Sequence, residues 1–380
     1  MRTLYFLRHG DPALPPNVSV CLGRMDVPLS AFGRLRAAVA AHALAKLPIA
    51  AVFCSPLLRA RQTADLLHCP YQILGGLQEI DTGEWDGLTF DDIRLEWPEL
   101  YEKRGKNPFL PFPKAEPPGL SLLRFLRAIG DAARQAEGDL LFVSHAGILR
   151  LFFAVLKGLP PLGHLPALTR KDAEELLLSA DTEAIRKHPG YGSLSVATEK
   201  GGILSPCSWG RIPRPLPDRA FCLSLLEAAN VPPHILRHCK AVARKAEEMA
   251  DALALAGHPL QKEQILAASL LHDIARTQKN HAEKGADALK RLGYPGIAAL
   301  IRTHHDLPCD TAVDEAAIVF LADKLVQEDQ AASIRQRFEI SFKKCVSKMQ
   351  KERHQERYHA ARCLAEKVNR ICGREIAKME

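Results

Sequence analysis

Three features are missing from this 380-residue sequence, and each absence excludes a class of protein. No stretch approaches the ~20 consecutive apolar residues of a membrane-spanning helix, so we expect no membrane segment. The apolar run Thr3–Leu7 stops at Arg8-His9 and is too short for a secretory signal. The ten cysteines contain no CxxC pair and no zinc-type Cys/His spacing, and a chain of this length needs no disulfide framework. These absences predict a soluble protein of a reducing, cytoplasmic compartment.

The composition is that of an ordinary globular protein. Hydrophobic residues make up 47% of the chain and charged residues 25%, which excludes a disordered or collagen-like protein. A length of 380 residues favours two domains, or three.

The net charge of +7 is concentrated at the end of the sequence. Residues 335–380 contain 13 basic and 6 acidic side chains, whereas the two signs balance before them. A nucleic-acid surface would account for this segment, but no aromatic stacking platform accompanies it. We therefore favour the solvated face of a long C-terminal helix and do not expect nucleic acid as a partner.

Strand and helix patterns alternate through the first half of the chain. Short apolar runs predict strands at 4–7, 50–54, 139–143 and 191–197, and helical patterns cover 31–47, 59–67 and 122–136. Such alternation predicts an α/β three-layer sandwich, with a mostly parallel sheet covered on both faces. The polar segment 169–187 is interpreted as a helical insertion.

A proline-rich segment divides the chain. Residues 205–217 carry four prolines, which favour extended chain and predict a linker. The first domain is therefore expected at 1–204. Leucine, alanine and charged residues at helical spacing follow, and they predict an all-α domain at 218–334 with a basic helical extension at 335–380.

Four motifs in the first half combine histidines with arginines. They are Leu7-Arg8-His9-Gly10, Ser55-Pro-Leu-Leu-Arg59-Ala-Arg-Gln-Thr63-Ala, Leu77-Gln-Glu79 and Val143-Ser-His145-Ala-Gly147. Phosphoryl transfer needs a neutral nucleophile, which histidine supplies near neutral pH, and fixed positive donors, which arginine supplies. His9 and His145 follow predicted strands, and ligands of open α/β sheets bind at the carboxyl ends of strands. One histidine alone would more often have no chemical role, but four motifs together indicate a phosphoryl site.

These motifs resemble those of the histidine phosphatase superfamily, which has the phosphoglycerate mutase-like fold. The resemblance covers about residues 1–204, and Cys21–Ser30 with Tyr191-Gly-Ser-Leu-Ser is similar to the α-ribazole phosphatase branch. It implies that His9 is the nucleophile that becomes phosphohistidine and that Glu79 donates the proton to the leaving group. It also implies that Arg8, Arg59 and His145 bind the phosphoryl group, and that this domain needs no cofactor.

Two details bear on the reaction of this domain. Pro118-Gly119-Leu120-Ser121 stands where the family usually has Pro-Gly-Gly-Glu-Ser, so an acidic residue is missing there. The core up to His145 lacks the insertions of the family's mutases. We therefore favour hydrolysis, with a phosphoglycerate mutase-type phosphotransferase as the alternative.

The second half contains histidines and aspartates within apolar surroundings. They are His238, the pair His272-Asp273, His281, the pair His304-His305, and Asp323. A His-Asp pair between Leu271 and Ile274 is costly to bury unless a partner satisfies it. A divalent cation is such a partner, and mixed His/Asp ligands suit manganese, iron, cobalt, nickel or zinc. The alternative is a set of ordinary histidines, since 15 occur in the chain.

This pattern resembles the HD-domain metal-dependent phosphohydrolases, whose signature is H…HD…D on separate helices. The resemblance covers about residues 218–329. It implies that His238, His272, Asp273 and Asp323 bind a first divalent metal ion, with magnesium also among the candidates. It implies further that His281 and one or both of His304 and His305 match the extra histidines of members that hold two metal ions, while the choice between one ion and two stays open. The sequence Gly293-Tyr294-Pro295 precedes the histidine pair and is interpreted as a turn that ends a helix.

Together the two halves predict a bifunctional phosphohydrolase. The first site would act on a phosphomonoester, and the second on a nucleotide-like phosphate ester or anhydride. The expected partners are a small phosphorylated metabolite or a nucleotide, without a membrane, and no oligomeric state is predicted. In a second hypothesis the HD domain is a nucleotide-sensing module that regulates the phosphatase.

Overall fold

The computed structural model describes residues 1–107, 109–181 and 188–380. The chain forms two compact units, Met1–Arg214 and Pro215–Glu380. No helix within the described residues is long and apolar enough to cross a membrane.

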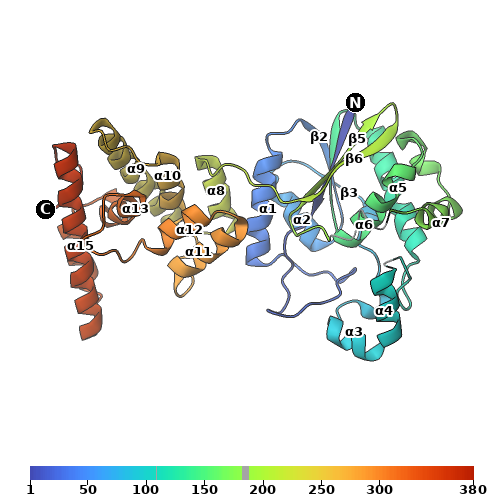
Figure 1. Cartoon of the computed structure of the whole chain (residues 1–380), viewed down its shortest axis with the longest axis horizontal. Helices are drawn as coiled ribbons and strands as arrows, with labels where there is room; N and C mark the ends of the chain where they lie inside the picture. Colours follow the sequence, from blue (N-terminus) through green and yellow to red (C-terminus); the bar gives the residue numbers. More distant parts are fainter. Residues whose placement is uncertain (108, 182–187) are drawn as a thin grey trace. The chain divides into compact units, whose positions relative to one another are not determined.

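A six-stranded sheet forms the centre of the first unit (Figure 1). Its strands are β1 (Arg2–Arg8), β2 (Ile49–Cys54), β3 (Gln72–Ile73), β4 (Asp139–Ser144), β5 (Leu194–Lys200) and β6 (Ile203–Arg211). They lie in the order β3-β2-β4-β1-β5-β6. The first four are parallel, and β5 and β6 are antiparallel to their neighbours. The predicted α/β class and mostly parallel sheet are confirmed.

Helices cover both faces of this sheet, as the three-layer prediction requires (Figure 1). The first unit contains α1 (Ala31–Leu44), α2 (Leu58–Asp65), α3 (Phe90–Glu96), α4 (Pro98–Lys106), α5 (Pro118–Gln135), α6 (Ala146–Val155) and α7 (Arg170–Leu178). Successive side chains of β1 lie on opposite faces of the sheet. Phe6 packs with residues of α5 and α6, and Leu7 packs with residues of α1 and α2. The predicted insertion contains α7, but residues 182–187 lie outside the described residues.

The predicted linker at 205–217 needs correction. Its first part belongs to β6, which pairs with β5 and forms the edge of the sheet. An edge strand tolerates proline because the missing N–H donor can face away from the neighbouring strand, and Pro206 lies in β6. The segment without regular structure is residues 212–218, and the first unit extends to Arg214 instead of 204.

The second unit is helical. It contains α8 (Arg219–Ala228), α9 (Pro233–Leu255), α10 (Lys262–Leu271), α11 (His281–Leu292), α12 (Pro295–Arg302), α13 (Glu315–Lys324), α14 (Ile334–Phe342) and α15 (Lys348–Cys372). Gly293, in the left-handed region at φ 100°, separates α11 from α12, so the Gly-Tyr-Pro turn is as predicted. One correction is a small hairpin of β7 (Val326–Gln327) and β8 (Gln330–Ala331).

The C-terminal segment is part of the second unit and not a separate extension. The backbone N–H of Ile334 donates to the Lys378 carbonyl at 3.0 Å. Ala361, Leu364 and Val368 of α15 are fully buried. The basic segment therefore contributes to the core of this unit as well as to its surface.

Candidate active sites

The first site lies at the carboxyl ends of β1 and β4. These strands are parallel neighbours, with Arg8 in register with Ser144, so the residues that follow them meet at one edge of the sheet. The rings of His9 and His145 are 5.0 Å apart, and both side chains are buried. The topology thus brings together two histidines that are far apart in the sequence.

Hydrogen bonds orient the His9 ring. Its Nδ1 donates to the Gly10 carbonyl at 2.7 Å, and its Nε2 accepts from Nε of Arg59 at 3.2 Å. Because a carbonyl can only accept, the proton is on Nδ1 and the lone pair is on Nε2. Burial and the charges of Arg59 and Arg8 hold the pKa of His9 well below its usual range. The imidazole is therefore neutral at physiological pH, as a nucleophile must be.

Two arginines give this pocket its positive charge. Arg59, on α2, is fully buried, and its two terminal nitrogens donate to the carbonyls of Met25 and Gly23 at 2.7 Å each. Arg8 lies over the Tyr191 ring, with its Cζ 3.7 Å from the ring centroid, and Nη1 of Arg8 is 3.2 Å from Nδ1 of His188. Both guanidinium groups are thus held in place beside His9.

His145 is fixed from the neighbouring strand. Its Nε2 is 2.7 Å from the Ser55 hydroxyl, which follows β2. Burial and the positive charge of Arg59 hold the pKa of His145 well below its usual range. A neutral ring with a hydroxyl partner can donate a hydrogen bond to a phosphoryl oxygen.

Glu79 lies against the start of α6, the helix that begins directly after His145. Its carboxylate oxygens accept from the backbone N–H groups of Ile80, Gly147 and Ile148, each at 2.8 Å. A Cβ at Gly147 would lie 2.7 Å from the Glu79 carboxylate, so a larger residue there would displace the carboxylate from this position. The helix start places the carboxylate beside the histidines, and its role as proton donor stays a prediction.

The second site is formed where several helices of the second unit end or begin. His238 lies on α9, His272 and Asp273 follow α10, and Asp323 lies on α13. Nε2 of His238 is 3.1 Å from Oδ1 of Asp323. Nε2 of His272 is 3.6 Å from Oδ2 of Asp273 and 3.8 Å from Oδ1 of Asp323. The four residues predicted as the first metal set therefore converge.

Backbone carbonyls orient the histidines of this cluster. Nδ1 of His238, His272 and His304 donates to the carbonyls of Glu328, Ser269 and Ile301, at 2.6, 2.8 and 2.6 Å. Each ring therefore turns its Nε2 toward the carboxylates. Within the described chain, the buried Nε2 atoms of two of these rings, those of His272 and His304, have no hydrogen-bond partner. An imidazole lone pair that faces a carboxylate, with no proton between the two, leaves both groups without a donor. A bound cation would accept electron pairs from both groups.

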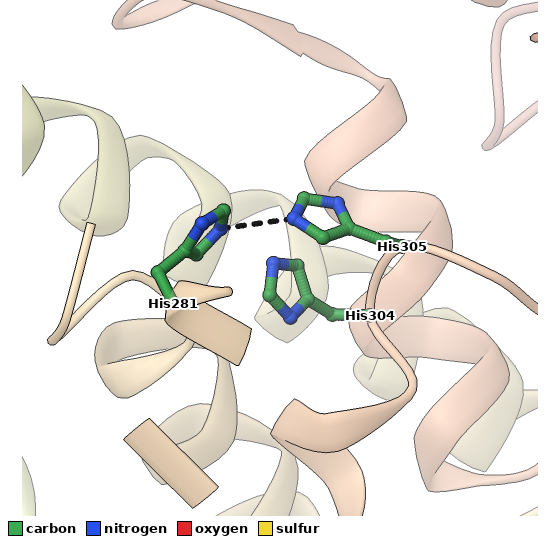
Figure 2. Close-up of side chains that lie close together, drawn as sticks. All are labelled: His281, His304 and His305. Atoms are coloured by element: carbon green, nitrogen blue, oxygen red, sulfur yellow. Dashed lines mark hydrogen bonds between the residues drawn. The ribbon is translucent and has the colours of Figure 1, made fainter. Parts of the chain in front are cut away.

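The three further histidines, His281, His304 and His305, lie close to one another (Figure 2). Nε2 of His281 is 2.9 Å from Nε2 of His305 and 3.1 Å from Oδ1 of Asp273. Nε2 of His304 is 3.9 Å from the same carboxylate oxygen. One nitrogen from each of the three histidines lies within 4.8 Å of the others. Asp273 thus lies between the two predicted metal sets and can serve both.

The two carboxylates of the cluster are ionised at neutral pH. Burial raises the pKa of Asp323, but Lys324 and His238 outweigh it and hold that pKa well below the usual range. Burial likewise raises the pKa of Asp273, and His272 and His281 outweigh it. Burial lowers the pKa of His304 to about 3. The cluster therefore presents carboxylates and a neutral imidazole, which fit a divalent cation.

Comparison with known families assigns both units. Residues 4–171 match the model of the histidine phosphatase superfamily (branch 1). Residues 235–327 match the HD domain model. The chain carries a histidine phosphatase domain followed by an HD domain.

Individual relatives match parts of the chain. Agropine synthesis reductase of Rhizobium rhizogenes is 32% identical over 40% of this chain and 34% of its own length. The tRNA (cytidine(56)-2'-O)-methyltransferase of Picrophilus torridus is 28% identical over 45% of this chain and 52% of its own length. The chain thus spans about half or less of these curated relatives.

Solved structures match about half of the chain. A mycobacterial glucosyl-3-phosphoglycerate phosphatase aligns at a TM-score of 0.46 and 22% identity, over 56% of this chain and 100% of its own. The α-ribazole phosphatase of Shigella flexneri aligns at 0.44 and 22%, over 56% of this chain and 98% of its own.

The histidine phosphatase domain also uses residues that the sequence analysis did not select. The Thr63 hydroxyl accepts from the Gly10 N–H at 3.1 Å and donates to the Arg59 carbonyl at 2.8 Å. Thr63 therefore links the nucleophile loop to α2, and Ser55 positions His145. Both lie in the motif that contains Arg59, so their spacing was a usable signal, whereas nothing marked His188.

Glu116 supplies an acidic group close to the Pro-Gly-Leu-Ser segment. Its carboxylate accepts from Arg24 and Ser121, each at 2.7 Å, and pairs with Arg124 at 3.1 Å. Arg124 in turn donates to the Glu79 carbonyl at 2.8 Å. The acidic residue missing at 118–121 thus has a counterpart two residues upstream, and it supports the backbone that carries Glu79.

The His-Asp pair of the HD domain lies at the end of a helix and not inside one. His272 is the C-cap of α10, and Asp273 lies in the turns that follow. The turn lets the two side chains approach the same cluster, which successive positions of a helix do not favour.

A cavity of about 670 Å³ lies over the HD cluster. His238, Asp273, His305 and Asp323 line it. Beyond the end of the HD match at 327, the side chains of Arg337, Lys344, His354 and Arg357 also line it. Part of the basic C-terminal segment therefore faces this cavity. The excess of basic residues at 335–380 was the sequence signal for these side chains, although from sequence alone it favours the solvated face of a helix.

Proposed function

We propose that the chain is a bifunctional phosphohydrolase. Its histidine phosphatase domain would cleave a phosphomonoester of a small metabolite through a phosphohistidine on His9, and its HD domain would cleave a nucleotide-like phosphate ester or anhydride with the help of a divalent metal. The observation that carries the proposal is the unprotonated Nε2 of His9, which accepts from Nε of Arg59 at 3.2 Å in a buried, cationic pocket.

In the first reaction, Nε2 of His9 attacks phosphorus and the bond to the leaving oxygen breaks. Glu79 gives a proton to that oxygen, so that an alcohol leaves. Arg8, Arg59 and His145 hold the phosphoryl oxygens while negative charge is redistributed. Water then attacks phosphorus and gives a proton to the Glu79 carboxylate, while the bond between phosphorus and Nε2 of His9 breaks. Phosphate leaves, and the neutral imidazole and the protonated Glu79 are restored.

In the HD domain, His238, His272, Asp273 and Asp323 would hold one cation, and His281, His304 and His305 would hold a second one with Asp273. A bound divalent cation would supply concentrated positive charge against the phosphate oxygens of the substrate. The support is the set of buried Nε2 atoms of His272 and His304 that lack a hydrogen-bond partner among the described residues. The backbone carbonyls that hold each Nδ1 keep these rings oriented without a cation.

Chelation should separate the two activities. With a panel of phosphomonoesters and nucleotides, EDTA should leave monoester hydrolysis at the His9 site unchanged and abolish hydrolysis in the HD domain, because His9 chemistry uses only side chains. Phosphate release with and without EDTA measures this.

Three results would contradict the proposal in different ways. Complete inhibition of both activities by EDTA would remove the metal-free His9 mechanism. Transfer of the phosphoryl group to a second alcohol in place of water would indicate a mutase. A nucleotide that changes the His9 activity without being consumed would make the HD domain regulatory.

Arg337 and Lys344 line one part of the HD cavity and are called its cationic wall. This wall supports a substrate with more than one phosphate. Replacing Arg337 and Lys344 together by glutamine should raise KM for a nucleoside triphosphate by at least about 10-fold, because each charge-assisted contact to phosphate contributes ~1.5–3 kcal/mol. The KM for a monophosphate should change much less, since its phosphate lies at the metal cluster. Steady-state kinetics of the HD activity measures both.

Lys343 provides the matched control. It is exposed, adjacent to Lys344, and does not line the cavity, so Lys343→Gln should leave both KM values unchanged. An equal increase in KM for the monophosphate and the triphosphate in the double variant would refute a polyphosphate site on this wall.

A further inference from the structure

A third cluster of metal-ligating side chains lies apart from both proposed active sites. Cys309, His359 and Cys363 each place one ligand atom within 4.8 Å of the other two. Cys309 belongs to the loop between α12 and α13, and the other two residues belong to α15. No spacing in the sequence indicated this cluster, because its first member lies 50 positions before the nearest of the other two.

The geometry of the pair on α15 is that of metal ligands. His359 and Cys363 are four residues apart and therefore share one face of the helix. Nε2 of His359 is 3.6 Å from Sγ of Cys363. A tetrahedral zinc ion with Zn–S of about 2.3 Å and Zn–N of about 2.0 Å would place these two donor atoms about 3.5 Å apart. Both cysteines are free thiols.

We propose that Cys309, His359 and Cys363 bind a soft divalent cation of the zinc class. Two thiolates and one imidazole are a ligand set that zinc prefers, and the fourth tetrahedral position would be open to water. The cation would displace a proton from each thiol on binding. This site is independent of the HD cluster, whose ligands are only nitrogen and oxygen.

The bound ion would clamp the loop that follows His304 and His305 to α15. The loop already contacts this helix on either side of the cluster. Before it, the Asp306 carboxylate accepts from Arg357 at 2.9 Å. Beyond it, Nζ of Lys367 donates to the carbonyls of Cys309 and Thr311, each at 2.9 Å. The cluster thus lies between polar contacts that already join the loop to α15, and a bound metal would add a further link there.

Cobalt substitution of the full-length protein tests the proposal. In protein freed of metal under a phosphine reductant, Co²⁺ should produce thiolate-to-cobalt charge-transfer absorption, and added Zn²⁺ should remove it. The HD cluster contains no thiolate and cannot give this band. The band should be lost in Cys309→Ser and in Cys363→Ser. It should persist in Cys372→Ser, the control at the end of the same helix, and in His272→Ala.

A second measurement addresses the clamp. Hydrogen exchange of residues 303–313 should slow by at least about 10-fold when Zn²⁺ binds the wild-type chain, as expected for a local opening that a bound ligand suppresses. The same exchange should not respond to Zn²⁺ in Cys309→Ser. Absence of the charge-transfer band in the wild-type chain, its persistence in the serine variants, or a Cys309–Cys363 disulfide in protein isolated under reducing conditions would each overturn the proposal.

Discussion

Replacing His9 by alanine should lower phosphomonoester hydrolysis by at least about 10³-fold, because the attacking atom is removed. The expected loss is in kcat, since Arg8, Arg59 and His145 remain to bind the phosphoryl group. Rapid quench with a radiolabelled monoester should trap an acid-labile phosphoenzyme in the wild-type chain and none in the variant. Phosphate-release kinetics provides the second measurement.

Two controls make this experiment specific. His164 is an exposed histidine of the same domain, and His164→Ala should keep full activity. His9→Gln preserves most of the side-chain volume and should be as inactive as His9→Ala, which excludes a loss caused by a void. A His9 variant that keeps full turnover, or a labelled phosphoenzyme in His9→Gln, would show that another residue is the nucleophile.

Replacing His272 and Asp273 together by alanine should abolish the metal-dependent activity of the HD domain. Two ligands are removed, one of which lies between both predicted metal sets, so metal affinity should fall by at least about 100-fold. Elemental analysis of the purified protein and titration with Mn²⁺ or Co²⁺ measure the binding directly. Hydrolysis at the His9 site should be unchanged.

His234 supplies the matched control for this variant. It lies on the first turn of α9 and lines the same cavity, but it is outside both metal clusters. His234→Ala should therefore bind metal as the wild-type chain does. If the double variant retained the wild-type metal content, or if the wild-type chain bound no divalent cation at the HD cluster, the metal-dependent assignment would be refuted.

Many strands and helices, and the resemblance to both families, could be predicted from local patterns, but β3, β6 and the helices α3, α4 and α6 were not among the predicted elements. Apolar runs located β1, β2 and β4, and helical spacing predicted the all-α second domain, where Val242, Ala246, Met249 and Leu253 form a buried apolar face on α9. The errors arose where local pattern and tertiary context disagree. Pro206 suggested a linker but lies in an edge strand, where its missing donor is tolerated.

The candidate residues could likewise be selected from sequence, but their arrangement could not. The motifs singled out His9, Arg59 and His145, while the parallel pairing of β1 and β4 decided that the two histidines meet. Their protonation depends on burial and on neighbouring charges, which no single motif encodes. The same holds for the backbone carbonyls that orient the imidazoles of the HD cluster.

Residue types and their spacing along the chain were therefore sufficient to predict two sites for phosphate chemistry and a helical second half. Only the fold revealed the cationic wall from Arg337 and Lys344, and the meeting of Cys309 with His359 and Cys363. The physical reason is that spacing records neighbours within one helix or strand. Contacts between elements depend on how whole faces pack, so residues tens of positions apart become neighbours without any local signal.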